Sequence, residues 1–458
     1  MKTEWLGQIG WDAPMLCLLI GVGAWLAVRL RGFPLLRPRA AFQVLRQKDR
    51  QTGGVTPTEA LFTALAGTIG AGNIVGVAGA ITLGGPGAVL WMWVTALLGI
   101  ATKYSEIVLT LETRVRGSDG AWRGGPWIAL MRRGKAGKAL GTAFLLCAVL
   151  ASFGIGNAVQ MQTIVSSVAA LPGPVFAARG THLLIGAATA AAVLLLGRGA
   201  KRVGRVASRL VPWMGALYVA AAGAVLVRYA PWIPRVAMQI LRAAFDPRAV
   251  LGGGIGVWQA VRAGAARGVF SNEAGLGSVP LAHASAETGS SVRQGLIGSL
   301  EVLCVTVVCT LTALVILLPA AAGAAGYAIP YGETGGAPLV MAALGCVFGE
   351  PAAAAILGMV LVCFALSSIL TWNLYGSRCA KELFGARGTV VHRVLFGAVL
   401  ITATQPDAAF VWSVSELFNA LMATPNLLSL LLLFPIVARA TRSFCRKPHG
   451  TVETDARM

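Results

Sequence analysis

The sequence has little charge for its length. Only 12% of its 458 residues are charged and 56% are hydrophobic, and the mean hydropathy is +0.73. A soluble protein of this size carries roughly 25% charged residues to cover its surface. Apolar runs of about 20 residues recur along the whole length, as spanning helices require. The composition therefore predicts an all-α polytopic membrane protein without a separate soluble domain.

The chain also lacks the patterns of a metal centre or a disulfide framework. It has only four histidines, and none of its eight cysteines stands in CxxC or Cys/His ligand spacing. Because Asp12 and Pro14 lead directly into a full-length apolar helix, we expect no cleavable signal. The cysteines, most of them in apolar stretches, are Cys17, Cys147, Cys304, Cys309, Cys346, Cys363, Cys379 and Cys445.

The surplus of positive charge comes with few interleaved aromatic residues. The chain has 38 Lys and Arg against 18 Asp and Glu, a formal net charge of +20. Nucleic-acid binding is not predicted, because basic loops that stay in the cytoplasm explain the charge better. Such loops fall at 29–50, 114–138, 198–209 and 378–393. They predict a multi-pass protein of the cell (inner) membrane, with its N-terminus outside and its C-terminus in the cytoplasm.

The alternation of apolar and basic segments predicts eleven spans. One of the last three short apolar pieces does not cross by itself, and 229–250 forms an amphipathic helix on the outer membrane surface. The predicted spans and pieces are 13–29, 59–83, 87–111, 139–169, 181–197, 210–228, 254–285, 295–319, 352–377, 394–404, 408–423 and 425–438. The predicted segments are 1–58 (first helix and basic loop), 59–228 (first repeat), 229–253 (outer connector), 254–440 (second repeat) and 441–458 (basic tail).

Two glycine-rich windows interrupt predicted spans. They read "GTIGAGNIVG" at 67–76 and "GVFSNEAGLG" at 268–277, and the two helices run in opposite directions in the predicted topology. Matching broken helices in two halves of opposite orientation are typical of an inverted-repeat transporter. The break frees backbone N–H and C=O groups, which must face protein or a water-filled cavity and there can bind ions. Tight helix–helix packing is the alternative explanation for the glycines.

Around these windows the sequence resembles the alanine/glycine:cation symporter family. The segments that carry the resemblance are "ALAGTIGAGNIVGVAGAITLGGPGAVLWMWVTALLGIATKYSE", "ARGVFSNEAGLGSVPLAHASAE", "FGIGNAVQMQ" and "FALSSILTWNLYGSRC". The resemblance covers nearly the whole chain. It implies a LeuT-like fold with a five-plus-five inverted repeat and one preceding helix. It also implies inward transport of a small neutral amino acid, alanine or glycine, with sodium as the coupling ion. Which amino acid is preferred and in which handedness, and the oligomeric state, stay open; a monomer is compatible with the sequence.

The resemblance also implies a substrate site on the first broken helix. Backbone N–H groups near Gly70 to Gly72 would hold the substrate carboxylate, and the amide of Asn73 would face substrate or ion. The indole of Trp372 would restrict the substrate to a small side chain. Packing for Trp372 and an interhelical hydrogen bond for Gln160 are the alternatives. The full set is Thr68, Gly70, Ala71, Gly72, Asn73, Gln160, Phe270, Ser271 and Trp372.

For sodium, the resemblance implies five oxygen ligands. Carbonyls of Ala66 and Ile69 would come from the first broken helix. A later helix would add the Phe364 carbonyl and the hydroxyls of Ser367 and Ser368, whose i, i+3, i+4 spacing puts them on one face. The alternative for the two serines is a hydrogen bond back to their own helix.

Glu273 and His283 are interpreted as gating or structural residues. An intramembrane acid is a functional candidate by default, but Glu273 is expected to pair with Arg267 or His283. Proton coupling through Glu273 or Glu106 is the alternative to sodium. An embedded enzyme with Ser271 as nucleophile, or a channel, is less well supported, because the chain has few histidines and a two-half arrangement.

The chain departs from the family pattern at three places. Ala71 stands where the family commonly has threonine, and Thr371 where it commonly has glycine. The segment "GGPWIAL" at 124–130 replaces a methionine and paired tyrosines. The first two positions fall in the predicted pocket, so they bear on which substrate is accepted.

Overall fold

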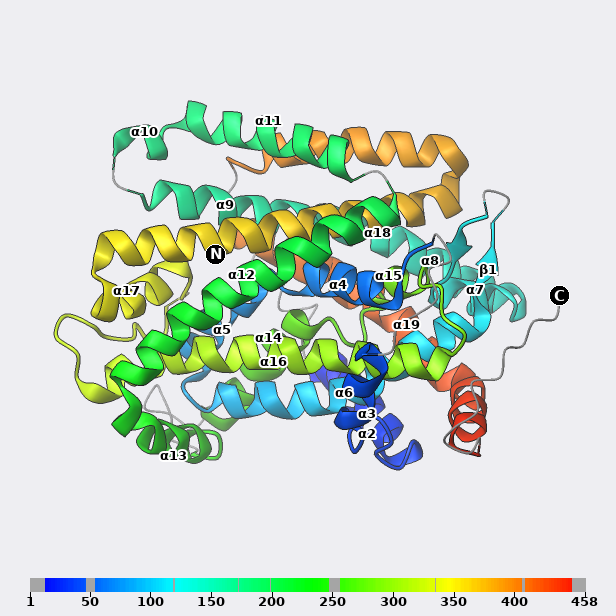
Figure 1. Cartoon of the computed structure of the whole chain (residues 1–458), viewed down its shortest axis with the longest axis horizontal. Helices are drawn as coiled ribbons and strands as arrows, with labels where there is room; N and C mark the ends of the chain where they lie inside the picture. The colour runs from blue at the N-terminus through cyan, green and yellow to red at the C-terminus, as the bar shows by residue number, and fades with distance from the viewer. Residues whose placement is uncertain are drawn as a thin grey trace.

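The computed structural model describes residues 13–46, 54–117, 120–171, 173–197, 199–246, 256–333, 335–405 and 408–446. Nearly all of these residues are helical, as Figure 1 shows. The predictions for residues 1–12, Lys48, Arg50, Arg248 and the end of the basic tail lie outside the described residues.

The first half contains the helices α2 (Ala13–Arg29), α3 (Pro38–Arg46), α4 (Pro57–Thr68), η1 (Ala71–Asn73), α5 (Val75–Gly84), α6 (Ala88–Thr113), α7 (Pro126–Met131), α8 (Gly134–Phe153), η2 (Gly154–Ala158), α9 (Val159–Ala169), α10 (Pro174–Ala177), α11 (Arg179–Leu196) and α12 (Ala200–Arg228). The second half contains η3 (Ala230–Trp232), α13 (Ile233–Ala243), α14 (Gly256–Asn272), α15 (Pro280–His283), α16 (Ser291–Ala322), α17 (Ala337–Phe348), α18 (Glu350–Thr402) and α19 (Ala408–Arg446). Two short antiparallel strands, β1 (Val115–Arg116) and β2 (Trp122–Arg123), follow α6.

Most predicted spans coincide with helices, and the differences have physical reasons. The span 13–29 has the bounds of α2. Helix α12 begins at Ala200 and not at 210, because lysine and arginine are good helix formers although they interrupt the apolar pattern. The pieces 408–423 and 425–438 form one continuous helix, α19, which passes through Pro425 without ending. The pieces 352–377 and 394–404 both lie in α18, whose backbone kinks at Gly385 with φ +68°.

The described helices make a multi-pass membrane protein. Seven of them are long and apolar enough to cross a membrane, or eight if the bent pair of α4 and α5 is one span. The apolar helices α2 and α17 are shorter. The count of eleven spans stays a prediction.

The first glycine-rich window is a true helix break. Helix α4 starts with a capping box, in which Thr56 accepts the N–H of Glu59 at 3.1 Å and Glu59 accepts that of Thr56 at 2.9 Å. It ends at Thr68, and α5 leaves at an angle of 66° after the short turn η1. Between them Gly70 is extended, with φ −135° and ψ −161°. The break therefore leaves main-chain groups outside the helical ladder inside the bundle.

The second window is also broken, and its backbone is left-handed at three positions. Helix α14 ends at Asn272, and φ is +52° at Glu273, +93° at Gly275 and +79° at Gly277. Glycine takes such angles without a steric cost, whereas a glutamate seldom does and needs support from its surroundings. Both predicted helix breaks are therefore present.

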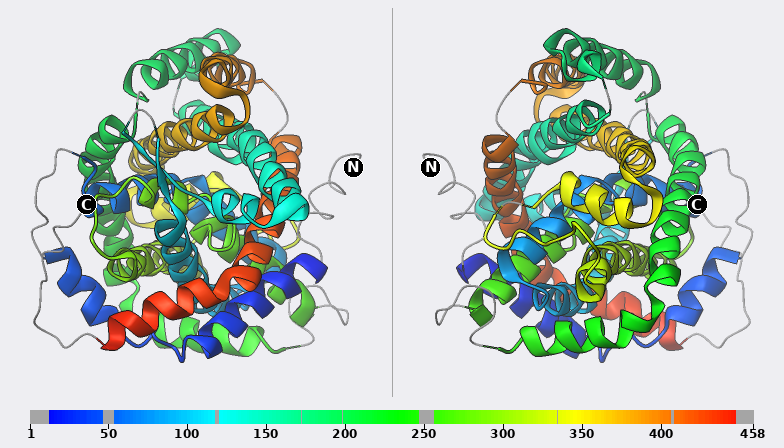
Figure 2. Two further views of the ribbon diagram at one scale, coloured as in Figure 1. Left: turned by 90° about the vertical axis from the view of Figure 1, so that its right-hand side faces the viewer. Right: turned by 90° about the vertical axis from the view of Figure 1, so that its left-hand side faces the viewer.

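The broken helices lie in the middle of the bundle. In Figure 1, α4, α5 and α14 are central, with α18 above them and α6 below. In the most apolar 18-residue stretch of α6, 83% of the residues are buried, whereas in that of α11 only 22% are buried. Helix α11 runs beside the last part of α18 at the edge of the molecule (Figures 1 and 2). We take such exposed apolar helices to face lipid.

The predicted surface helix over 229–250 corresponds to α13. Of its eleven residues only Val236 and Ile240 are buried, one turn apart on one side. Figure 1 places α13, α10 and α17 at one end of the molecule and α15, β1 and α7 at the other. These ends are called the α17 end and the α15 end below.

Candidate functional site

Two serine hydroxyls of α18 lie against carbonyls at the end of α4. The Ser368 hydroxyl donates to the carbonyls of Ala66 at 3.1 Å and Gly67 at 3.2 Å. The Ser367 hydroxyl donates to Ala66 at 3.3 Å and to Phe364, on its own helix, at 2.9 Å. Four of the five predicted ion ligands thus lie together, and Gly67 joins them.

The chemistry of this serine cluster suits a small hard cation. Its polar atoms are carbonyl and hydroxyl oxygens, and Ser367 and Ser368 are buried. A softer neighbour is the thioether of Met214, 3.8 Å from the Ser367 hydroxyl. Ile69, the fifth predicted ligand, is the residue at which α4 loses its helical conformation, and its carbonyl accepts from neither serine. Among the described residues no group of three His, Cys, Asp or Glu side chains could hold a metal ion.

The unwound segment after α4 adjoins the serine cluster. The N–H of Ala71 donates to Oε1 of Gln160 at 3.2 Å, and Nε2 of Gln160 donates to the carbonyl of Ile155 at 3.0 Å. A Cβ added to Gly70 would lie 2.7 Å from the Ser368 hydroxyl and 3.1 Å from Oε1 of Gln160. The predicted carboxylate-binding segment, Gln160 and Ser368 are therefore immediate neighbours, and only glycine fits between them.

The side chain of Asn73 is engaged within the protein. Its amide donates to the carbonyl of Thr68 at 2.7 Å, and its oxygen accepts from the Cys309 thiol at 3.4 Å. The Thr312 hydroxyl donates to the Asn73 carbonyl at 3.0 Å. The hydroxyl of Thr68 donates back to Ala64 at 3.0 Å. Asn73 therefore holds the unwound segment in shape and ties it to α16, rather than presenting a free amide as predicted.

The two broken helices touch at Gly72. The Ser271 hydroxyl donates to the Gly72 carbonyl at 3.2 Å, and a Cβ on Gly72 would lie 2.9 Å from the ring of Phe270. Phe270 in turn packs on Trp412 of α19, with ring centroids 5.1 Å apart. The predicted residues Phe270 and Ser271 thus close one side of the unwound segment.

Trp372 is buried against the helix turn η2. A Cβ on Gly156 would collide with its indole, and the ring of Tyr375 meets it edge-on at 5.6 Å. The indole N–H makes no hydrogen bond, although the indole lies beside the Glu273 carboxylate. Thr371 faces the other way, and its hydroxyl donates to the Thr63 carbonyl of α4 at 3.3 Å.

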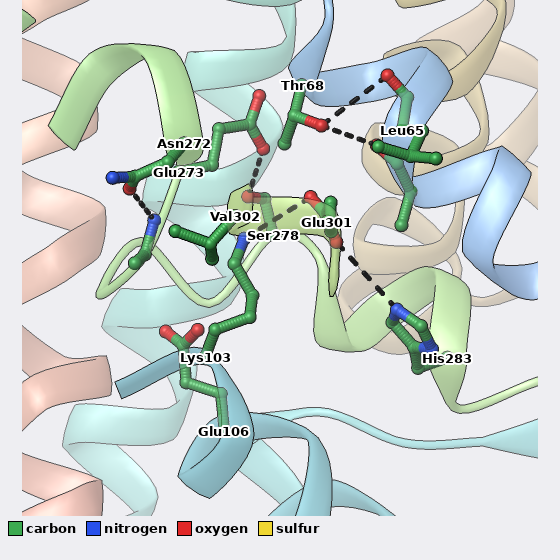
Figure 3. A network of polar contacts seen from close by, with 12 residues as sticks. Leu65, Thr68, Lys103, Glu106, Asn272, Glu273, Ser278, His283, Glu301 and Val302 are labelled. Carbon is green, nitrogen blue, oxygen red and sulfur yellow. Dashed lines mark hydrogen bonds and ion pairs between the residues drawn. The ribbon is translucent and has the colours of Figure 1, made fainter. Parts of the chain in front are cut away.

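A buried charged network lies beside the second break (Figure 3). Nζ of Lys103 is 3.5 Å from Oε1 of Glu301, and Nε2 of His283 is 3.9 Å from Oε2 of the same residue. Nδ1 of His283 lies 2.7 Å from the amide of Gln294. Removing one partner of such a fully buried pair typically costs about 3–5 kcal/mol, because the other charge is left uncompensated. His283 thus belongs to a network that joins α6, α15 and α16.

The predicted partners of Glu273 are wrong. Its Oε2 accepts from the Ser278 hydroxyl at 2.5 Å. Arg267 instead forms an ion pair with Glu416, and His283 faces Glu301. Because α14 ends at Asn272 and the backbone at Glu273 is left-handed, the Glu273 side chain meets Ser278 of the following segment.

Glu106 holds the unwound segment of the second broken helix. Its Oε1 accepts the N–H groups of Gly275 and Gly277, both at 3.1 Å, and the amide of Asn426 on α19 at 2.5 Å. Asn426 also donates to the Gly275 carbonyl at 2.8 Å. A carboxylate is a strong acceptor for such orphan N–H groups. Glu106 therefore stabilises the left-handed conformation at these two glycines.

Comparison with known proteins decides the family. Residues 2–456 match the sodium:alanine symporter family. The chain is 37% identical over 446 residues to the sodium/alanine symporter AgcS of Methanococcus maripaludis, covering 95% of this chain and 94% of that protein. The chain belongs to the sodium:alanine symporter family. This symporter is also 31% identical over 448 residues to the probable sodium/glutamine symporter GlnT of Bacillus subtilis, covering 95% and 89% of the two chains.

The fold of this symporter is LeuT-like. The structure of MhsT in complex with L-phenylalanine superposes with a TM-score of 0.57 at 14% identity, covering 84% of this chain and 97% of that one. At this identity the likeness shows the fold alone. Together with the family, it makes the chain a transporter and not an enzyme.

At the α15 end of the symporter, main-chain contacts and one arginine side chain join segments next to the broken helices. Val55, just before α4, pairs with Ala286, just after α15, and the N–H of Glu287 donates to the Val55 carbonyl at 2.8 Å. The Arg114 guanidinium donates to the carbonyls of Ala284 at 3.0 Å and Ala286 at 2.6 Å. Burial lowers the pKa of Arg114 to about 10, so it remains a cation at neutral pH. Both broken helices are thus joined at this end.

On the α13 side of the breaks, an ion pair covers the aromatic residues above the unwound segment. Nη1 of Arg267 is 2.9 Å from Oε1 of Glu416, and its guanidinium lies 4.9 Å from the ring centroid of Trp412. Both charged side chains are about a fifth exposed. Trp412 packs on Phe270, which in turn lies next to Gly72. The Arg267–Glu416 ion pair and the two aromatic rings therefore lie in sequence over Gly72.

Several residues of the site were missed by sequence reasoning. They are Gly67, Cys309 and Thr312 around the first break, and Lys103 and Asn426 around the second. Lys103 carried a usable signal, because a lysine inside an apolar span is a functional candidate by itself. The carbonyl of Gly67 and the thiol of Cys309 carried none, since their roles depend on the packing of distant helices.

Proposed function

We propose that this protein imports a small neutral amino acid, alanine or glycine, with Na⁺ by alternating access. The observation that carries the proposal is the contact of Ser367 and Ser368 with the carbonyls at the end of α4. Carbonyl and hydroxyl oxygens at one point between a broken helix and its neighbour are the ligands that a small hard cation takes. The family supports sodium as that cation.

Na⁺ would act by joining α18 to α4. The hydroxyls of Ser367 and Ser368 now donate to the carbonyls, and in the loaded site both would turn their lone pairs to the ion. The carbonyls of Ala66 and Phe364, with that of Ile69 or Gly67, would complete the set. Binding the ion would therefore stabilise the unwound segment, which starts at Gly70, directly after Ile69.

The amino acid would bind to that segment. Its carboxylate would take the backbone N–H groups from Gly70 to Gly72, and in doing so replace Oε1 of Gln160 on Ala71. It would also compete with the Thr68 carbonyl for the N–H of Gly70. Carboxylates are favoured at such N–H groups of a broken helix. Because ion and carboxylate would share one unwound segment, each would strengthen the binding of the other.

The aromatic residues around the segment favour a small substrate. Phe270 packs closely on Gly72, and Trp372 fills the space at Gly156. A substrate side chain that is only a methyl group or a hydrogen would displace these aromatic rings least, which supports alanine and glycine. Neither contact distinguishes L-alanine from D-alanine, so uptake of both enantiomers belongs in the test.

Alternating access would break the contacts at the two ends of the site in turn. We propose that 59–228 and 254–440 are the two repeats, that the α15 end faces the cytoplasm and that the α17 end faces outward. Import would then open the Arg267–Glu416 side first and the Val55–Ala286 contact second. The joint at Val55 and Ala286 links both broken helices, so both would move in the inward-opening step.

The test is uptake of labelled alanine and glycine by proteoliposomes of the purified protein. We compare an inward Na⁺ gradient, an inward proton gradient and no gradient, with L- and D-alanine as separate substrates. The proposal expects saturable uptake that follows the Na⁺ gradient and stops when the gradient collapses. Uptake that follows only the proton gradient would replace Na⁺ by a proton as coupling ion. Non-saturating flux would indicate a channel.

A further inference from the structure

One face of α12 forms a basic groove at the α15 end of the molecule. Arg202, Arg205 and Arg209 lie along this face at spacings of three and four residues, and Trp213 follows them one turn later. They surround a groove of about 460 Å³ together with Val206 and Leu210. The three arginines are exposed. The groove thus combines three guanidinium groups with an apolar floor.

None of these arginines has an acidic partner in an ion pair among the described residues. Arg202 donates to the carbonyl of Leu195 at 3.0 Å, whereas Arg205 and Arg209 take part in none of the ion pairs between described side chains. Like charges on one helix face repel each other. The groove therefore carries uncompensated positive charge that an anion would offset.

The groove lies at the basic start of α12, next to the apolar part of the helix. The first ten residues of the helix carry Lys201 and the arginines, and the following turns are apolar. Trp213 is 51% exposed, and further along the helix Val219 and Val227 are 47% and 79% exposed. An exposed indole between a basic and an apolar stretch is typical of the membrane–water interface. In a membrane the arginines would thus lie at the level of lipid phosphates, and the apolar side chains at the level of acyl chains.

We propose that this groove binds an anionic phospholipid. The phosphate would lie between Arg205 and Arg209, where guanidinium groups match its oxygens, and the acyl chains would pass along Trp213 and Val219. Basic pockets on transmembrane helices at the cytoplasmic side bind such headgroups. The apolar continuation of the groove favours a lipid over a free phosphate ion, which would contact only the arginines.

The opposite face of α12 links this site to the transport machinery. A Cβ on Gly204 would lie 3.2 Å from the Thr63 hydroxyl and 3.3 Å from Cβ of Glu59, both on α4. Further along, Met214 contacts Ser367 of the serine cluster. A lipid bound in the groove would therefore stabilise the packing of α12 against α4, the first half of the first broken helix.

The experiment measures lipid binding without reference to the transported substrate. The purified full-length protein in neutral detergent is titrated with phosphatidylglycerol, and bound lipid is counted by native mass spectrometry. Arg205→Gln with Arg209→Gln should weaken the tightest binding event about thirtyfold, which corresponds to about 1 kcal/mol per arginine. Lysine at both positions should weaken the binding less than glutamine does, because the charge is kept although the guanidinium group is lost.

A matched control carries two other exposed arginines of the same end. Arg132→Gln with Arg133→Gln removes equal charge from the connection between α7 and α8, and should leave the tightest event unchanged. Equal binding by the Arg205/Arg209 glutamine variant and the parent would overturn the proposal. So would an equal loss in the control, because the effect would then be a general one of surface charge.

A second readout locates the lipid. Phosphatidylglycerol with brominated acyl chains should quench part of the tryptophan fluorescence, and Trp213→Phe should remove that part. Inorganic phosphate at tens of millimolar should not displace the lipid. Quenching that is unaffected by Trp213→Phe, or full displacement by phosphate, would contradict a lipid site in this groove.

Discussion

Replacing Ser368 by alanine tests the proposed coupling of ion and broken helix. The change removes a hydroxyl that lies 3.1 Å from the Ala66 carbonyl and 3.2 Å from that of Gly67. A hydrogen-bonding contact to a charged group contributes about 1.5–3 kcal/mol, and 1.4 kcal/mol is a factor of ten. The Na⁺ concentration for half-maximal alanine uptake should therefore rise about tenfold to a hundredfold, while the folded protein loses only about 1 kcal/mol of stability.

The assay is alanine uptake into proteoliposomes at increasing external Na⁺, with K⁺ keeping the ionic strength constant. Ser167→Ala is the matched control, because the Ser167 hydroxyl is also buried but donates only to Thr163 of its own helix, at 2.7 Å. The control should keep the parent's Na⁺ dependence. At saturating Na⁺ the Ser368 variant should approach the parent rate, since the substrate segment itself is unchanged.

Two results would refute the reasoning. One is an unchanged Na⁺ dependence in Ser368→Ala, which would mean that this hydroxyl is not an ion ligand and only bonds the two helices together. The other is an equal shift in Ser167→Ala, which would mean that loss of any buried hydroxyl perturbs uptake. Thermal unfolding of both variants, with and without Na⁺, separates ion binding from general destabilisation.

Three further predictions concern the surroundings of the segment. Gly72→Ala should raise the KM for alanine about tenfold, because its Cβ would lie 2.9 Å from the Phe270 ring and overpacking costs about 1–3 kcal/mol. In uptake assays, adding Phe270→Leu to this variant should recover most of the loss. A parent-like KM for the single variant would contradict the tight contact. Glu106→Gln should lower the free energy of unfolding by about 1–2 kcal/mol, because a neutral acceptor replaces a charged one for three donors. A thermal unfolding curve identical to the parent's would disprove the role of Glu106 in holding the second break. Arg267→Gln should raise the KM for alanine severalfold, because it breaks the partly exposed 2.9 Å ion pair with Glu416 that covers the site. Exchanging the charges of Arg267 and Glu416 should restore uptake. If the exchange restores no uptake, the ion pair does not determine access to the site.

The sequence was sufficient to predict features that depend on local pattern. The span 13–29 was predicted with its bounds because an uninterrupted apolar run ends at Arg29. Both helix breaks were predicted because glycines gather at 67–76 and 268–277. The start of α12 was missed, since its arginines resemble a loop in a pattern of apolar runs although they are good helix formers.

Contacts between distant segments could not be predicted in the same way. The pairing of Ala71 with Gln160 joins residues 89 positions apart, and that of Asn426 with Glu106 joins residues 320 positions apart. Glu273 was expected to pair with Arg267 or His283, but Arg267 meets Glu416 of α19 and His283 faces Glu301. The serine cluster was located by the family resemblance, because nothing in the spacing of Ser367 and Ser368 indicates which carbonyls they meet.

The most direct test of the account is calorimetric binding of alanine to the purified protein in Na⁺ and in K⁺. If Na⁺ at the serine cluster shapes the segment from Gly70 to Gly72, alanine should bind in Na⁺ and bind at least tenfold more weakly, at about 1.4 kcal/mol less free energy, in K⁺. Equal affinity in the two salts would contradict the account, because ion and amino acid would then occupy independent sites.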